Sequence, residues 1–221
     1  MRQTIKNYTM KPLFLLFIGL LSLQMTAQDS GKSKQLLDEV SHTIENYNNI
    51  ILTFDYALDN DQEKIHQKTG GKIYVKGDKY HLNFMGTDRI SDGNRIYNII
   101  HEDEEVYISD ANEESNGFTP ASILHFYKKG FHYTWGKLQA VEGVKVQYIK
   151  LKPIKEDDIA YIMLGIDTNT KHIHSITYHD KRNTKVSIRI RTFKPNENLS
   201  PKEFTFDSAK YKAKNYSITE L

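Results

Sequence analysis

Histidine and carboxylate side chains are the first candidates for chemistry in this 221-residue chain, and their spacing disfavours a metal site. His172-Ile173-His174 places two imidazoles on one face of an expected strand, whereas His179 falls on the opposite face by parity. Zinc needs at least one more ligand nearby, and no carboxylate stands at a matching spacing. A solvated polar strand face is the favoured interpretation, and we expect no metal.

Nucleophilic and acid–base chemistry finds equally little support. The chain has no G-x-S-x-G, H-E-x-x-H or P-loop motif, and Ser91-Asp92-Gly93 is typical of a turn. The acidic runs at 102–105 and 156–158 lack the spacing of a calcium loop and are interpreted as solvated turns. Zero Cys removes thiol nucleophiles, disulfides and a lipid-modified N-terminal Cys. We therefore expect no enzyme and no cofactor, with catalysis by a buried His or carboxylate as the remaining alternative.

Residues 1–27 have the pattern of a secretory signal peptide. Arg2, Lys6 and Lys11 precede an apolar run from Leu13 to Leu23, which is too short to span a membrane, and Ala27 supplies a small residue before the expected cleavage. Residues 28–221 then form the expected single domain, beyond the inner membrane. Met10 is an alternative start, and a retained N-terminal anchor is an alternative interpretation of the leader.

Charge gives no support to nucleic-acid binding. The full chain has 30 basic and 28 acidic residues, and loss of the leader leaves 27 basic residues, a net charge of −1. One small basic stripe, Lys185 with Arg189 and Arg191, could meet an acidic partner or lipid headgroups. A plain surface face is the favoured interpretation.

The pattern of apolar residues predicts a mainly β protein. A helical period covers about 32–47, and a period of two follows from residue 49 onward. We expect strands over 49–59, 72–76, 80–84, 95–101, 106–109, 144–151, 161–167, 172–179, 185–193 and 204–206. Gly70-Gly71 is expected to break the chain, and Thr119-Pro120 to start a short helix over Ala121 to Lys129 that Gly130 ends. The sum is one curved antiparallel sheet or open barrel of about ten or eleven strands, with two helical insertions.

Apolar side chains share one face of the expected strands, as in Leu52, Phe54 and Tyr56. Such a face packs either into a sandwich core or against a hollow site for an acyl chain or a similar ligand. The few helical residues and the 14 Tyr favour a hollow site, because tyrosine lines cavities with a polar tip, whereas periodicity alone favours the packed core, and both interpretations stay open at this point.

The order of short motifs along the chain resembles the periplasmic outer-membrane lipoprotein carrier (LolA) family. The motifs are a signal peptide, an amphipathic helix, the alternating strand 52–58, and five segments that follow it. These segments are Gly71-Lys72-Ile73-Tyr74-Val75-Lys76, Lys79-Tyr80-His81-Leu82, Ile90-Ser91-Asp92-Gly93-Asn94-Arg95-Ile96-Tyr97, Phe118-Thr119-Pro120-Ala121-Ser122-Ile123-Leu124 and Glu203-Phe204-Thr205-Phe206. The resemblance covers almost the whole chain after the leader.

The resemblance implies an unclosed antiparallel β-barrel covered by a lid of short helices. It also implies a monomeric periplasmic carrier that takes acylated lipoproteins from an inner-membrane ABC transporter to the outer membrane, where a receptor is a further candidate partner. The first helix would plug one side through Leu37, Val40 and Ile44. The expected cavity lining is Leu52, Phe54, Tyr56, Leu58, Tyr80, Leu82 and Phe84, with Ile123, Leu124, Phe126 and Tyr127 from the lid. The alternatives are a carrier of another lipid or acylated product and a lipoprotein-sensing module.

Overall fold

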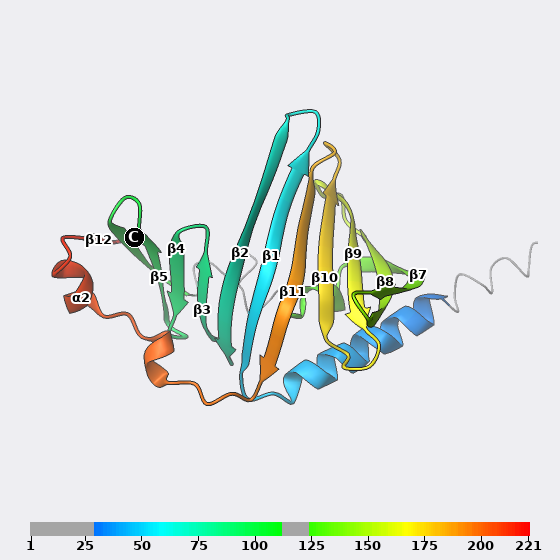
Figure 1. The fold of residues 1–221 in the computed structure, drawn as a ribbon, viewed down its shortest axis with the longest axis horizontal. Helices are drawn as coiled ribbons and strands as arrows, with labels where there is room; N and C mark the ends of the chain where they lie inside the picture. The colour runs from blue at the N-terminus through cyan, green and yellow to red at the C-terminus, as the bar shows by residue number, and fades with distance from the viewer. Residues whose placement is uncertain (1–28, 112–123) are drawn as a thin grey trace, which may run out of the picture.

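The computed structural model describes residues 29–111 and 124–221, which build one sheet of twelve strands (Figure 1). The strand order is β12-β6-β5-β4-β3-β2-β1-β11-β10-β9-β8-β7, so β12 and β7 are the two edges and the sheet does not close. The strands are β1 (Ile50–Asn60), β2 (Ile65–Lys76), β3 (Lys79–Phe84), β4 (Thr87–Ser91), β5 (Arg95–Ile100), β6 (Glu105–Asp110), β7 (Phe131–Val141), β8 (Val144–Pro153), β9 (Ile159–Asp167), β10 (Ile173–Asp180), β11 (Lys185–Pro195) and β12 (Ser217–Glu220).

The expected fold class, a mainly β protein with an unclosed antiparallel sheet, is confirmed. Neighbouring strands are antiparallel except for β12, which pairs in parallel with β6. The remaining elements are a helix over residues 29–45, two 3-10 turns, η2 (Phe126–Lys128) and η3 (Pro201–Phe204), and the short helix α2 (Ser208–Lys212). Among the described residues, no helix has both the length and the apolar character needed to cross a membrane.

The N-terminal helix (residues 29–45) packs its apolar side against one face of the sheet, here called the inner face. Leu37, Val40 and Ile44 are all buried and join one core cluster with residues of β1, β2, β8, β9 and β10. The helix therefore belongs to the core at one end of the strands, as Figure 1 shows for the blue helix below β10, β9 and β8. Burial of this apolar stripe supplies the driving force that a helix of this length lacks alone.

The C-terminal segment covers part of the opposite face, here called the outer face. Tyr211 of α2 is buried together with Ile90, Ile99 and Val106 of β4, β5 and β6, and Phe206 stacks on Tyr97 at 4.7 Å between ring centroids. This second cluster explains why β4 to β6 carry apolar residues on both faces: the C-terminal segment buries those on the outer face. Figure 1 shows the segment in orange and red beside these strands.

A carboxylate on the outer face joins β3, β4 and the turn after β5 to the C-terminal segment. Asp88 accepts hydrogen bonds from His81 Nε2 at 3.3 Å, Asn83 Nδ2 at 2.7 Å and His101 Nε2 at 2.8 Å, and His101 Nδ1 lies 3.1 Å from the Tyr216 hydroxyl. The hydrogen bond from His81, helped by those from Asn83 and His101, holds the pKa of Asp88 well below its usual range. The ionised carboxylate is thus the form that the fold stabilises.

We expect Asp88→Asn to lower the free energy of unfolding by about 2 kcal/mol at pH 7, because it removes a charged acceptor shared by three donors. A carboxyl whose pKa is depressed in the fold contributes stability above its unfolded pKa, near 4, and loses it as the pH falls further. The difference between wild type and variant should therefore shrink below about pH 4. Urea unfolding across a pH series measures this, with Asp78→Asn in the exposed β2–β3 turn as the control. A difference that stays constant down to pH 2 would contradict the assignment.

Several expected boundaries were wrong, each for a physical reason. Gly70-Gly71 lies inside β2 and does not break it, because a glycine there accommodates a ring described below. β7 was missed because a register shift between Trp135 and Leu138 disturbs its alternation. Residues 204–206 form no strand, since Ser200 caps the 3-10 turn that begins at Pro201. β12 was also missed, because its four residues form a strand only through pairing with β6.

Candidate functional site

The strand register places all seven expected lining residues on the inner face. Leu52 pairs with Ile73, which pairs with Leu82, so that β1, β2 and β3 present these side chains to the same side. Two of the seven, Leu52 and Tyr80, are buried at 5% and 2% exposure and belong to the core beneath the helix. The other five are half-buried: Phe54, Tyr56, Leu58, Leu82 and Phe84. The inner face thus changes from a filled core to a partly exposed apolar surface along the strands.

Three aromatic rings meet on that partly exposed surface. Phe84 lies 5.7 Å from Phe54 and 5.1 Å from Tyr56 between ring centroids, the second pair edge to face. Gly71 on β2 lies directly beneath the Phe54 ring, where a Cβ atom would stand 2.4 Å from the ring carbon Cζ. The glycine therefore lets the ring lie across β2 toward β3. Burial also raises the pKa of Tyr56, so its hydroxyl stays neutral in this apolar setting.

Gly71→Val should displace the Phe54 ring, since the added Cβ and the ring cannot occupy the same space. We expect binding of a fluorescent fatty-acid probe to weaken about tenfold, with the sheet intact, because valine suits a strand. In a Phe54→Ala background the same substitution should have no further effect on probe binding. Equal losses in both backgrounds would show that Gly71 acts independently of the ring.

The facing part of the inner surface carries two aromatic residues that sequence reasoning missed, Tyr178 and Phe131, beside the expected lid residue Phe126. Tyr178 of β10 shares the inner face with Leu58, because both pair with Val186 of β11. Phe126 lies 6.2 Å from Tyr178 and 6.1 Å from Phe131 between centroids. Burial raises the pKa of Tyr178 to about 12, so its hydroxyl is uncharged. The alternation over 172–179 contained this signal, and only the pairing with β11 connects it to Leu58.

We call this partly exposed surface the apolar groove. It is lined from β1 and β3 by the half-buried residues named above. From β10, β11, η2 and the start of β7 it is lined by half-buried residues that pack against the same core. The second group is Tyr178, Ile188, Ile190, Phe126 and Phe131. Apolar side chains held at a partly exposed surface can shelter a hydrocarbon chain.

The expected lid residues are divided by the structure. Ile123 and the first three positions of the expected helix, 121–123, lie outside the described residues, and the described remainder forms only the 3-10 turn η2 in place of the expected helix. Leu124 and Tyr127 are buried in the core cluster, at 6% and 0% exposure, and Phe126 is half-buried beside the groove. Tyr127 makes an O–H···O contact of 3.2 Å with Ser41 of the N-terminal helix, and burial raises its pKa to about 12. The described lid positions are therefore docked on the N-terminal helix.

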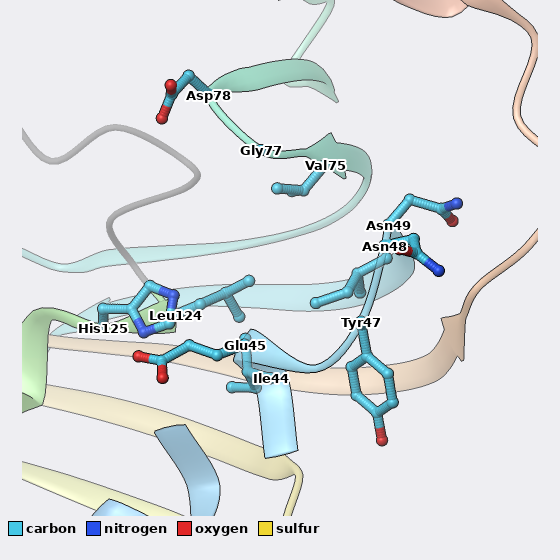
Figure 2. A pocket seen from close by; sticks show the side chains of 11 residues that line it. Ile44, Glu45, Tyr47, Asn48, Asn49, Val75, Gly77, Asp78, Leu124 and His125 are labelled. Carbon is cyan, nitrogen blue, oxygen red and sulfur yellow. The ribbon is translucent and has the colours of Figure 1, made fainter. Parts of the chain in front are cut away.

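A separate pocket of about 480 Å³ lies where the N-terminal helix ends (Figure 2). Ile44, Val75 and Leu124 line it with buried apolar side chains, and Glu45 and His125 add polar ones. Burial, together with the charge of nearby Lys128, lowers the pKa of His125, which favours the neutral imidazole. Of the expected site residues only Leu124 lines this pocket, and no sequence pattern pointed to it.

Two of the histidines considered for a metal site, His172 and His179, pack against aromatic rings. His172 stacks on Phe193 at 3.8 Å between centroids and lies 2.8 Å from the Tyr47 hydroxyl, and burial lowers its pKa. His179 stacks on Tyr161 at 4.4 Å. Residues 29–111 and 124–221 contain no group of three or more histidine and acidic side chains that could hold a metal ion.

An unclosed antiparallel sheet with a helix filling one end of its inner face and a partly exposed apolar surface at the other defines a LolA-like β fold. The sequence model of the outer membrane lipoprotein carrier protein LolA matches residues 45–207. The chain therefore belongs to the LolA family. None of the curated proteins compared with the chain matches it.

Two solved structures, a Thermus thermophilus protein and MucB, give the same fold at low sequence identity. An uncharacterized conserved protein from Thermus thermophilus superposes with a TM-score of 0.59 at 10% identity, covering 86% of this chain and 99% of that one. MucB superposes with a TM-score of 0.50 at 10% identity, over 81% of this chain and 64% of MucB. The Mycobacterium tuberculosis lipoprotein LppX gives a TM-score of 0.49 at 12% identity, with coverages of 75% and 97%.

Proposed function

We propose that this protein is a periplasmic carrier that shelters the acyl chains of lipoproteins in the apolar groove and takes them from the inner to the outer membrane. The observation that carries the proposal is the groove itself, where Phe54, Tyr56 and Phe84 stay half-buried although the part of the inner face beneath the N-terminal helix is a filled core. Membership of the LolA family supports the same cargo.

The physical need for such a groove follows from the cargo. Each methylene group of an acyl chain costs about 0.8 kcal/mol in water, so several chains cannot cross an aqueous compartment uncovered. Transfer also requires release, which favours a partly open surface over a sealed cavity. The uncharged hydroxyls of Tyr56 and Tyr178 add no buried charge to this surface. The proposed role is therefore binding and transfer without catalysis.

A carrier of this kind needs a partner that loads the cargo, the cargo itself and a site of unloading. An inner-membrane lipoprotein-releasing ABC transporter would load the groove, the acylated lipoprotein would occupy it, and an outer-membrane receptor is a further candidate for unloading. We propose that the carrier works as a monomer.

A release assay tests this role. Inner-membrane vesicles that hold the transporter and a newly acylated lipoprotein are given ATP and the purified protein. We expect the lipoprotein to appear in the soluble fraction as a one-to-one complex, and a cargo variant without the acylated cysteine to stay unbound. Release of free lipid alone would favour a carrier of another lipid. Binding of the lipoprotein without release would favour a sensing module.

A further inference from the structure

Lysines gather on the outer face of the sheet, on the side away from the apolar groove. On β2 and β3 the inner positions are Ile73, Val75 and Tyr80, so the alternate positions point outward. Four exposed lysines occupy these outward positions: Lys68, Lys72, Lys76 and Lys79.

The same face continues across the sheet to β8. The register joins Lys68 of β2 through Ala57, Ser187, Thr177 and Met163 to Lys150 of β8 in one row of outward positions. Three more exposed lysines lie on this face of β8 and β11: Lys152, Lys185 and Lys194. The row crosses six strands, a width of about 25 Å at the usual strand spacing.

The carboxylates on these strands are already engaged. Asp55 pairs with Arg191, Asp59 lies 3.2 Å from His66 Nδ1, and Glu142 of the β7–β8 turn pairs with Arg189. None of the eight lysines has an ion-pair partner in the described part of the chain.

Two of the lysines rest on tyrosine rings of the same face. Lys72 Nζ lies 4.5 Å from the ring centroid of Tyr74, and Lys150 Nζ lies 4.1 Å from that of Tyr161. The chain after residue 27 carries a net charge of −1. The lysines of the outer face are therefore a local concentration of positive charge on a protein that is slightly negative as a whole.

The outer face of the described strands presents no fully exposed large apolar side chain, and its Tyr74 and Tyr161 are half-buried beside lysines. The most exposed large apolar residues of the described chain lie elsewhere: Met85 and Ile154 in turns, Leu138 on the edge strand β7, Ile65 in the inner-face register, and Leu221 at the end of the chain. A stable protein partner normally buries aromatic or apolar anchors at the centre of the contact. Spread lysines without such an anchor suit a surface of lipid headgroups, which adapts to them one by one.

We propose that the outer face of β2, β3, β8 and β11 docks the protein on a bilayer surface of anionic phospholipid, while the groove on the inner face stays available to cargo. The contact is electrostatic and reversible, so it weakens steeply as salt rises. This contact would keep the proposed carrier close to a membrane. The lysines that make it lie on the face opposite the groove.

Vesicle flotation tests this docking surface. The protein, purified from the periplasm of expressing cells, is mixed with phosphatidylcholine vesicles that contain either no phosphatidylglycerol or about one third of it. We expect binding only to the anionic vesicles and its loss in about 0.5 M salt. The triple variant Lys68→Glu/Lys72→Glu/Lys150→Glu should bind about a hundredfold more weakly.

A matched variant separates this face from net charge. Lys32→Glu/Lys34→Glu/Lys129→Glu makes the same change in charge at exposed positions on the N-terminal helix and after η2, and it should bind within about threefold of wild type. Equal losses in the two triple variants, or no binding to anionic vesicles at low salt, would overturn the proposal. Binding to an acidic protein of the membrane but not to its lipid would also overturn it.

The fatty-acid probe keeps this test distinct from the carrier role. The outer-face variant should still bind the probe as wild type does, because its three lysines lie on the face opposite the groove. Failed vesicle docking with intact probe binding therefore counts only against the docking surface, and failed probe binding by the wild type counts against the carrier.

Discussion

Phe54→Glu should abolish acyl-chain binding and leave the protein folded. The side chain is half-buried in the apolar groove, where it meets Phe84, so a carboxylate there can reach water when the groove is empty. Covering that carboxylate with a hydrocarbon chain would cost several kcal/mol, and we expect probe binding to fall at least about a hundredfold. Titration with a fluorescent fatty acid, next to a circular dichroism spectrum, measures both parts of the prediction.

The neighbouring residue provides the control for this variant. Thr53 stands on the same strand and points to the outer face, where its hydroxyl lies 2.8 Å from that of Thr192 and Lys72 is its partner across the strands. Thr53→Glu should bind the probe as wild type does. If both variants lost binding equally, the groove would be on the wrong face.

Val40→Asp should unfold the protein rather than open the groove. Val40 is fully buried between the N-terminal helix and the sheet, so the substitution removes packing and buries a charge without a partner. We expect a loss of about 4 kcal/mol in the free energy of unfolding. Urea unfolding measures this loss, and His42→Asp on the exposed side of the same helix should change stability by less than about 0.5 kcal/mol.

The stability of Val40→Asp shows whether the N-terminal helix is part of the core or a removable cover of the groove. If the N-terminal helix were a removable cover, Val40→Asp would leave the sheet folded and increase access to the groove. The buried positions of Leu124 and Tyr127 give the η2 region the same structural character. Leu124→Glu is for this reason a test of folding, and Phe54→Glu is the better test of the groove.

Much of the fold could be predicted because its local patterns agree with its tertiary packing. The alternation of β1 marks the inner face without ambiguity, and the apolar stripe at Leu37, Val40 and Ile44 marks the buried side of the N-terminal helix. β7 was lost because its bulge shifts the phase of the alternation, and β12 because a four-residue parallel strand has no pattern of its own.

The candidate site was predicted only in part, because the sequence shows which face of a strand a side chain occupies but not how far that side chain is buried. Leu52 and Phe54 have the same parity, yet the first is buried in the core and the second is half-buried in the groove. Their difference depends on where the N-terminal helix ends along the strands. Tyr178 and Phe131 reach the groove through pairings of strands far from β1 in the sequence, which periodicity does not reveal.

Native mass spectrometry with lipid extraction, on protein purified from its own periplasm, tests the central claim most directly. The account predicts a one-to-one complex with an acylated lipoprotein, which Phe54→Glu abolishes and Thr53→Glu retains. Free lipid or another acylated molecule in the groove would keep the carrier and change its cargo. A bound lipoprotein that survives unchanged in Phe54→Glu would contradict the account, because the acyl chains would then lie somewhere other than the apolar groove.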